Sequence, residues 1–226
     1  AVAENIFVLT QETLTAYSTG GNPQWSADTK NGIAVSATVE TSVCGLLTDE
    51  KLHIYDSISG DLKTSQTRSE GGGSKDTLLS TPQSFIYKTW SFLTAVDNNG
   101  DMKFELDMEA VINDIGYFSD LLIVSLQNNH IVAIDPHDGS ICWKNEFRSP
   151  QVPPYGDDEM FISSENGILA ITTEGESKSV SGLPDGSVYM TREGGVVYII
   201  KDDLISRYIR ENNRIEVDLI NESVGI

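Results

Sequence analysis

The sequence has few cysteines and few basic residues. Cys44 and Cys142 are the two cysteines among 226 residues, too few for a disulfide framework, and we expect both to be buried, reduced thiols. Lysine and arginine number 15 against 34 acidic residues, which gives a net charge of −19. A nucleic-acid interface needs clustered basic side chains, so this composition argues against one. The acidity suits a soluble surface, and it would also steer a basic partner toward the chain.

Long apolar segments are missing as well. No stretch approaches the roughly 18 consecutive apolar residues of a membrane helix, so we expect no membrane insertion. Residues 1–5 carry no basic segment followed by an apolar one. We therefore expect an intracellular protein, cytoplasmic or nuclear, or a periplasmic or secreted one if a signal peptide has been removed.

Helical periodicity is absent too, and a β-type repeat takes its place. Residues 131–143 read as an apolar strand, a turn closed by Asp138-Gly139, and a second strand ending in Trp143. Weaker copies recur, and the residues that close their apolar strands are Ser18, Asp56, Asp97, Asp135, Thr172 and Lys201, at intervals of 38, 41, 38, 37 and 29 residues. A period near 40 is the length of one four-stranded blade of a β-propeller.

The repeat predicts an all-β fold and a single domain over residues 1–226. We expect a β-propeller of about six four-stranded blades, with another strand upstream of each apolar strand. The first repeat begins directly with its second strand. An extra candidate strand at residues 214–220 follows the last repeat, and we predict that it closes the N-terminal blade, because an open sheet edge would invite pairing with other chains.

The positions of Ala133, Asp135, Gly139 and Trp143 resemble the repeat of the quinoprotein-like (PQQ-type repeat) β-propellers. Phe104 stands in place of the tryptophan in the copy around Gly100, and Trp25 retains it in the first copy. This superfamily includes pyrroloquinoline-quinone dehydrogenases and non-enzymatic relatives such as the outer-membrane assembly lipoprotein. The resemblance implies a propeller in which the tryptophan packs between blades, as in scaffolds of the WD40-like kind. It does not imply a quinone cofactor, because the chain is short and has no adjacent cysteines.

Candidate catalytic groups are sparse. The three histidines, His53, His130 and His137, lie in different repeats or turns without zinc-site spacing, so we expect neither a metal nor a cofactor. The repeat aspartates, Asp56, Asp97 and Asp135, fit two interpretations: caps of their own turns, or a ring of carboxylates that holds a cation. Glu40, Asn113 and Asp114 lie near the first strands of their repeats and are candidates for a cation-dependent hydrolase or lactonase.

Two aromatic segments could form a partner-binding surface. Trp90 and Phe92 lie in a predicted hairpin turn where polar residues are expected, and Trp90 either anchors a partner or packs on the next blade. Pro153, Pro154 and Tyr155 belong to a proline-stiffened connection between repeats. Residues 68–76 contain Gly71-Gly72-Gly73-Ser74, the composition of a flexible linker, either natural or engineered.

These observations favour a binding protein over an enzyme. We expect a protein–protein interaction scaffold that belongs to a larger assembly, with no catalytic residues. The alternative is a divalent-cation-dependent hydrolase that uses carboxylates in the propeller channel.

Overall fold

A computed structural model describes residues 5–38, 41–68, 76–147, 159–164, 167–179, 189–193, 196–201, 204–209 and 214–216. Within these ranges every regular element is a β-strand, as predicted, and no helix is long and apolar enough to cross a membrane. The chain divides into two compact units, Ala1–Ile112 with Pro136–Gly139, and Asn113–Asp135 with Ser140–Ile226. The single domain predicted for residues 1–226 stays a prediction.

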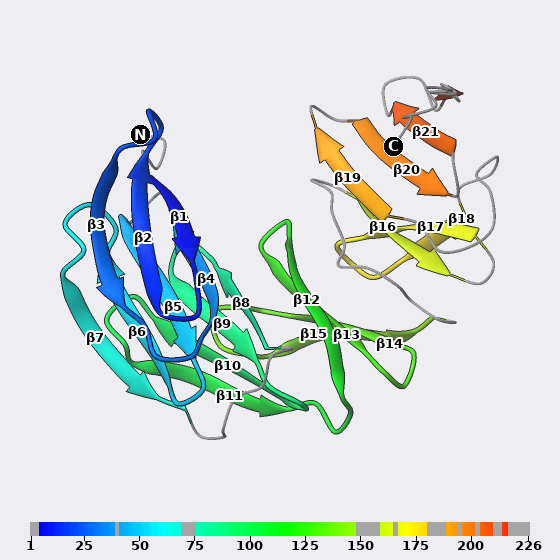
Figure 1. Cartoon of the computed structure of the whole chain (residues 1–226). Helices are drawn as coiled ribbons and strands as arrows, with labels where there is room; N and C mark the ends of the chain where they lie inside the picture. The colour runs from blue at the N-terminus through cyan, green and yellow to red at the C-terminus, as the bar shows by residue number, and fades with distance from the viewer. Residues whose placement is uncertain are drawn as a thin grey trace. The chain divides into compact units, whose positions relative to one another are not determined.

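The strands of the described ranges form six antiparallel sheets, which we label A to F in chain order (Figure 1). Sheet A contains β1 (Asn5–Leu9), β2 (Thr13–Ser18) and β3 (Pro23–Asp28); sheet B contains β4 (Gly32–Thr38), β5 (Val43–Thr48), β6 (Lys51–Asp56) and β7 (Leu62–Thr67); sheet C contains β8 (Thr77–Ser80), β9 (Ser84–Lys88), β10 (Phe92–Asp97) and β11 (Met102–Asp107). Sheet D contains β12 (Ile112–Phe118), β13 (Leu121–Leu126), β14 (His130–Ile134) and β15 (Ile141–Glu146); sheet E contains β16 (Glu159–Ser164), β17 (Gly167–Thr172) and β18 (Ser177–Ser179); sheet F contains β19 (Tyr189–Glu193), β20 (Val196–Lys201), β21 (Leu204–Ile209) and β22 (Arg214–Glu216).

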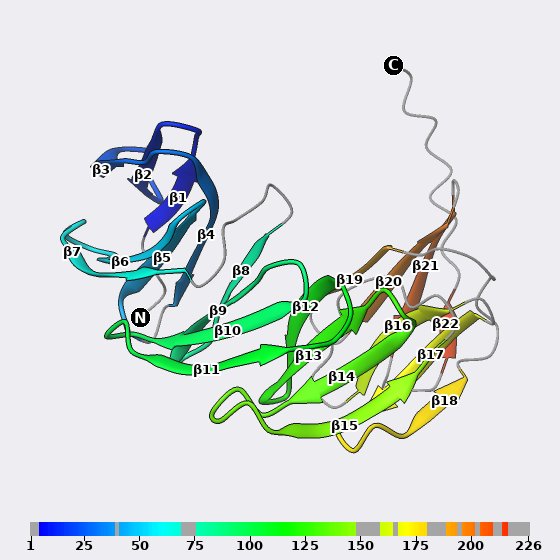
Figure 2. The ribbon, with the colours of Figure 1, turned by 90° about the horizontal axis from the view of Figure 1, so that it is seen from below.

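Consecutive sheets bury a common apolar core. In the first unit one cluster joins Leu14 of sheet A to Cys44 and Leu46 of sheet B, and a second joins Leu52 of sheet B to Phe85 of sheet C. In the second unit a third cluster joins strands of sheet D to strands of sheet E. Figures 1 and 2 both show sheets A, B and C following one another in the first unit. Sheet A thus packs on sheet B, sheet B on sheet C, and sheet D on sheet E.

The repeat glycine and the repeat tryptophan meet between neighbouring sheets. A Cβ added to Gly60 would lie 2.7 Å from the ring of Trp25 in β3. A Cβ added to Gly175 would lie 2.8 Å from the ring of Trp143 in β15. The two indole Nε1–H groups donate to the carbonyls of Ser57 and Thr173 at 3.1 and 2.8 Å. This is the packing that the resemblance implies. Two further pairs repeat the contact with other side chains, Thr64 on Gly100 and Phe104 on Gly139.

The last repeat differs from the prediction by one strand. Lys201 is predicted from the sequence to end the last repeat's apolar strand, but it ends β20, which is the second strand of the four-stranded sheet F, and the equivalent of the earlier apolar strands is the third strand, β21. With this assignment the equivalent strands of successive sheets end 38, 41, 37, 38 and 37 residues apart, and the short interval of 29 residues disappears. These strands are β2, β6, β10, β14, β17 and β21. The faint last copy has no repeat glycine to mark its register, which is why the sequence misplaced it.

The predicted closure of the N-terminal blade is wrong for residues 214–216. Strand β22 pairs with β21 through Tyr208↔Ile215 and completes sheet F as its fourth strand. Residues 217–220 lie outside the described residues. The first sheet does begin with its second strand, as predicted, since β1 corresponds to β5 and β9 in register.

The expectation of two buried thiols is correct for one of them. Cys44 is buried in the core between sheets A and B, and this burial raises the pKa of its thiol to about 12. Cys142 is exposed on β15, the fourth strand of its sheet, and neither cysteine forms a disulfide.

Candidate binding surfaces

The predicted anchor Trp90 lies in the turn between β9 and β10 and is 73% exposed. Backbone bonds fix this turn, because Ile112 N–H donates to the Trp90 carbonyl at 2.8 Å and Met108 N–H donates to the Ser91 carbonyl at 2.9 Å. The indole therefore projects from a well-held turn. Trp90 does not have the environment of Trp25 and Trp143, whose rings are half-buried on the glycines of neighbouring sheets.

The other predicted contact residues divide into two groups. Phe92 is the first residue of β10 and is partly buried beside Trp90 in the chain. Pro153, Pro154 and Tyr155 lie outside the described residues. Of the two predicted contact residues that the structure describes, Trp90 is thus the exposed one.

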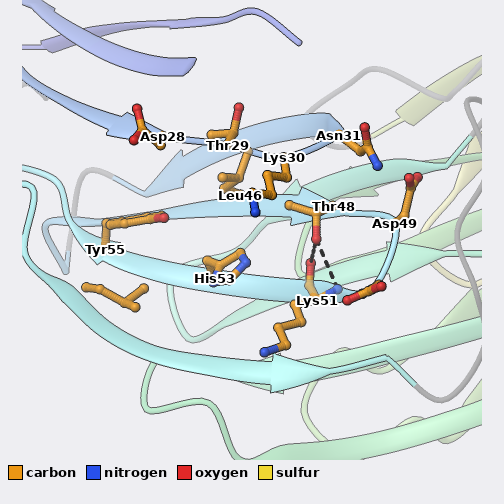
Figure 3. Close-up of a pocket in the computed structure, with 12 residues that line it drawn as sticks. Asp28, Thr29, Lys30, Asn31, Leu46, Thr48, Asp49, Lys51, His53 and Tyr55 are labelled. Atoms are coloured by element: carbon orange, nitrogen blue, oxygen red, sulfur yellow. Dashed lines mark hydrogen bonds between the residues drawn. The ribbon is translucent and has the colours of Figure 1, made fainter. Parts of the chain in front are cut away.

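The structure also contains a pocket of about 540 Å³ between sheets A and B, which sequence analysis did not identify (Figure 3). The connection from β3 to β4 and the turn from β5 to β6 form one end of it, and side chains of β5, β6 and β7 form the rest. Its lining consists of Asp28, Thr29, Lys30, Asn31, Leu46, Thr48, Asp49, Glu50, Lys51, His53, Tyr55 and Leu62. Charged groups of both signs lie at the two loops. The rings of His53 and Tyr55 and the apolar side chains of Leu46 and Leu62 form the remaining wall.

His53 is the pocket residue best suited to catalysis, and its side chain is hydrogen-bonded to a residue on the neighbouring strand β7. Its Nδ1 lies 2.7 Å from the hydroxyl of Ser65, which faces it directly across β6 and β7. Burial and then the nearby Lys51 ammonium lower the pKa of the imidazole, so the ring is neutral at pH 7. Tyr55 stacks on Trp25 with ring centroids 6.0 Å apart, and burial raises its phenolic pKa.

The His53–Ser65 pair does not constitute a catalytic site. Activation of a serine needs a base that is itself oriented by a third group, together with donors for an oxyanion. Among the described residues the hydrogen bonds of His53 and Ser65 provide neither, and a directly opposed pair is an ordinary sheet contact. The pocket is thus better suited to holding a side chain or small ligand than to catalysing its reaction.

The repeat aspartates act as turn caps where their bonds are resolved. Asp56 Oδ1 accepts the N–H groups of Ile58 and Ser59 at 3.0 and 2.9 Å. Asp97 Oδ1 accepts those of Asn99 and Asp101 at 2.8 and 2.9 Å. The N–H donors of Ser59 and Ile58 lower the pKa of Asp56. Burial acts in the opposite direction at Asp97, but its N–H donors outweigh burial and the pKa is also lowered.

Two of the three residues considered for a hydrolase, Asn113 and Asp114, lie in the described part of the chain. Asp114 Oδ1 accepts the N–H of Ile115 at 2.8 Å, and Asn113 is exposed beside it on β12. Glu40 lies outside the described residues. Across the described ranges no group of three or more His, Cys, Asp or Glu side chains is arranged to hold a metal ion.

No known protein family matches the sequence, and no curated protein does so either. Solved structures do match the fold. BamB from Moraxella catarrhalis has a TM-score of 0.62 at 16% identity over 88% of this chain and 67% of its own. Hsv2p from Kluyveromyces lactis has a TM-score of 0.66 at 14% identity over 91% and 71%, and the computationally designed protein Ika8 has 0.71 at 12% over 94% and 70%. The chain therefore has a β-propeller fold, built from blades of the predicted kind.

Proposed function

We propose that the chain is a protein–protein interaction scaffold of the non-enzymatic, PQQ-type repeat branch, and that Trp90 is an anchor of its partner surface. The observation that supports this most strongly is the 73% exposure of Trp90 on a turn held by backbone bonds. Exposed tryptophans cost solubility and are over-represented among residues that dominate binding energy. A rigid turn also lowers the entropy lost on association.

The proposal assigns Trp90 and Phe92 to the partner surface, and it proposes residues 153–155 as a further contact segment on grounds of their sequence. The net charge of −19 favours a partner with a basic surface, because opposite charges accelerate encounter. The two solved natural structures share the fold alone with this chain, so the proposal rests on the exposed anchor and the charge.

A capture experiment with matched variants tests the proposal. The purified chain is immobilised, bound proteins are identified by mass spectrometry, and the affinity of a recovered partner is measured by calorimetry. Trp90→Ala should weaken binding at least about tenfold, which corresponds to about 1.4 kcal/mol. Met102→Ala is the control, because Met102 is also exposed, at 53%, but lies on β11 outside the turn.

The outcomes separate clearly. Loss of binding in Trp90→Ala with normal binding in Met102→Ala supports the anchor. Equal affinities for the parent chain and both variants, with unchanged circular dichroism, would remove Trp90 from the interface. A chain that captures no partner at any ionic strength would contradict the scaffold function itself.

A further inference from the structure

The pocket between sheets A and B is built entirely within the first compact unit. Each of its 12 lining residues lies within residues 28–62 of that unit. Its volume of about 540 Å³ falls in the range of about 300–1,000 Å³ that is typical of small-molecule sites. The pocket is therefore large enough to hold a small organic molecule, and its lining indicates which kind.

The hydroxyl of Tyr55 is a donor that the protein leaves without a partner. Tyr55 is only 7% exposed, and its hydroxyl forms no hydrogen bond with any described residue. Stacking on Trp25, with ring centroids 6.0 Å apart, fixes the ring, and Figure 3 shows the hydroxyl oxygen directed toward the side of the pocket where Leu46 and His53 lie. Burial raises the phenolic pKa, so the hydroxyl keeps its proton at pH 7. A buried polar group normally has a hydrogen-bond partner, and an acceptor on a ligand would supply one here.

His53 offers a second donor to the same space. The Ser65 hydroxyl lies 2.7 Å from its Nδ1, which leaves Nε2 for a ligand. When Ser65 donates to Nδ1, the hydrogen of the neutral ring is on Nε2. An acceptor in the pocket favours this tautomer, because the Ser65 hydroxyl can donate as readily as it accepts.

Two lysines bring positive charge to these donors. Lys30 lies on the connection from β3 to β4, and in Figure 3 its side chain extends toward His53. The ammonium of Lys51 is close enough to lower the pKa of His53. Neither lysine forms an ion pair with a described residue, although Asp28 and Asp49 share the lining. The carboxylates of these two aspartates point away from His53 in Figure 3. The middle of the pocket thus presents donors and positive charge.

We propose that the pocket binds a small organic acid through the carboxylate of the acid. The carboxylate accepts hydrogen bonds from the Tyr55 hydroxyl and from His53 Nε2–H, beside the Lys30 ammonium. The apolar body of the acid packs on Leu46 and Leu62, which form the rest of that wall.

This site is separate from the proposed partner surface. Neither Trp90 nor Phe92 lines the pocket, so the proposal does not depend on the scaffold function. Failure of one proposal would leave the other standing.

The charge distribution favours a small acid with a single negative charge over an acidic protein segment. A net charge of −19 repels an acidic protein surface, whereas a small monoanion carries its charge only once. The carboxylates of Asp28, Asp49 and Glu50 at the two loops also disfavour a second negative charge on the ligand. Leu62, which is 54% exposed, gains cover only from a ligand with an apolar body.

The first arm of the test uses hexanoate as the probe. The isotope-labelled chain is titrated with hexanoate, and its amide resonances are followed by NMR. We expect saturable shifts confined to residues 28–31 and 46–62, with a dissociation constant in the millimolar range or below. Hexanamide has the same chain without the charge and should bind at least about tenfold more weakly, because hydrogen bonds to a charged group are the stronger ones. Hexylamine should not bind.

Matched variants assign the binding to the named groups. Tyr55→Phe keeps the ring that stacks on Trp25 and should weaken hexanoate binding about tenfold. Lys30→Met should weaken it about threefold, because the exposed ammonium is screened by solvent, and this loss should disappear in about 1 M salt. Lys63→Met is the control and should bind normally, since Lys63 pairs with Asp56 at 3.3 Å and lies outside the lining. Circular dichroism checks that each variant is folded.

The second arm searches for the natural acid. A small-molecule extract of the native cells is dialysed against the parent chain and against Tyr55→Phe, and the retained compounds are compared by mass spectrometry. Compounds that the parent chain alone enriches should carry a carboxylate and an apolar group.

Several results would overturn the proposal. The first is a set of pocket amides that hexanoate does not shift, and the second is equal binding of hexanoate and hexanamide, which would show that the carboxylate is not recognised. Unchanged affinity in both Tyr55→Phe and Lys30→Met would remove these groups from the site. Enrichment of neutral or basic compounds alone, or of none, would exclude a small acid. A captured protein that hexanoate displaces, with no acid enriched, would assign the pocket to a carboxylate of that protein instead.

Discussion

The indole of Trp25 lies on Gly60 of the neighbouring sheet and donates its Nε1–H to the Ser57 carbonyl at 3.1 Å. The contact is possible because Gly60 has no Cβ and adopts a φ of 77° that other residues rarely tolerate. Trp25 and Trp143 each lie on the glycine of the following repeat, so the contact gives the repeat glycine and the repeat tryptophan a common reason to recur.

Gly60→Ala should therefore cost more than a backbone effect alone. A Cβ at Gly60 would approach the Trp25 ring to 2.7 Å, whereas one at Gly21, with a φ of 80°, meets no atom within 4 Å. We expect a loss of about 1–2 kcal/mol in the free energy of unfolding for Gly21→Ala from the left-handed backbone. Gly60→Ala should lose about 1–3 kcal/mol more from overpacking. Urea denaturation of the two variants measures the difference, and equal losses would show that the ring contact contributes nothing.

Asp97 should stabilise its turn in a pH-dependent way. Its carboxylate accepts two N–H groups, and its pKa lies below the usual value despite burial. A lowered folded-state pKa stabilises the chain above the unfolded pKa near 3.8, and this contribution is lost as the pH falls through the folded pKa. Asp97→Ala should cost about 1–2 kcal/mol at pH 7, and the difference from the parent should shrink below pH 4. Asp101→Ala, in the same turn, is the control and should change little; a difference that persists in acid would contradict the carboxylate's role.

The sequence predicted strands and turns well wherever the repeat carried its glycine. Residues 131–143 form β14, the turn and β15 as expected, with Trp143 in the predicted place between sheets. The last repeat lacks this glycine, and there the assignment was one strand out. Trp25 and Trp143 each follow a repeat glycine by four residues, and Trp90 does not. This difference in the sequence indicates that Trp90 would not pack like Trp25.

Other features depended on spatial relationships that the sequence does not contain. The pocket exists because residues 28–31 lie beside residues 48–51 of the next sheet, and neither loop carries a recognisable motif. The exposure of Cys142 follows from its position on a fourth strand, where alternation along β15 leaves it facing solvent.

The two thiols should differ in reactivity. Cys142 is exposed, whereas Cys44 is buried and its pKa is raised to about 12. A thiolate is the reactive form, so one thiol per native chain should react with a disulfide reagent at pH 8, and two after unfolding. Cys142→Ser should abolish the fast reaction. A second fast thiol in the native chain would contradict the burial of Cys44 between sheets A and B.

Arg68 occupies a repeat position that holds the apolar residues Met108 and Phe147 in sheets C and D and the buried Thr29 in sheet A. Its N–H donates to the Glu50 carbonyl, as those of Met108 and Phe147 donate to the corresponding turns. Its side chain is fully buried, pairs with Asp76 at 2.5 Å, donates to the Thr48 carbonyl at 2.7 Å and lies over the ring of Tyr87. The ion pair thus joins the two ends of the glycine-rich segment at residues 69–75.

Removal of one partner should be far more costly than replacement of both. Arg68→Met leaves the nearly buried Asp76 carboxylate without its counter-ion, and Asp76→Leu leaves the buried guanidinium without its own, so each should lose about 3–5 kcal/mol. The double variant restores an apolar contact of the kind that Met108 makes, and it should lie within about 1.5 kcal/mol of the parent. A double-mutant cycle in urea measures the coupling, and losses that simply add would show that the pair contributes no specific interaction. Because a buried pair can be neutral for stability overall, near-parent stability of the double variant would indicate that it serves to hold residues 68 and 76 together.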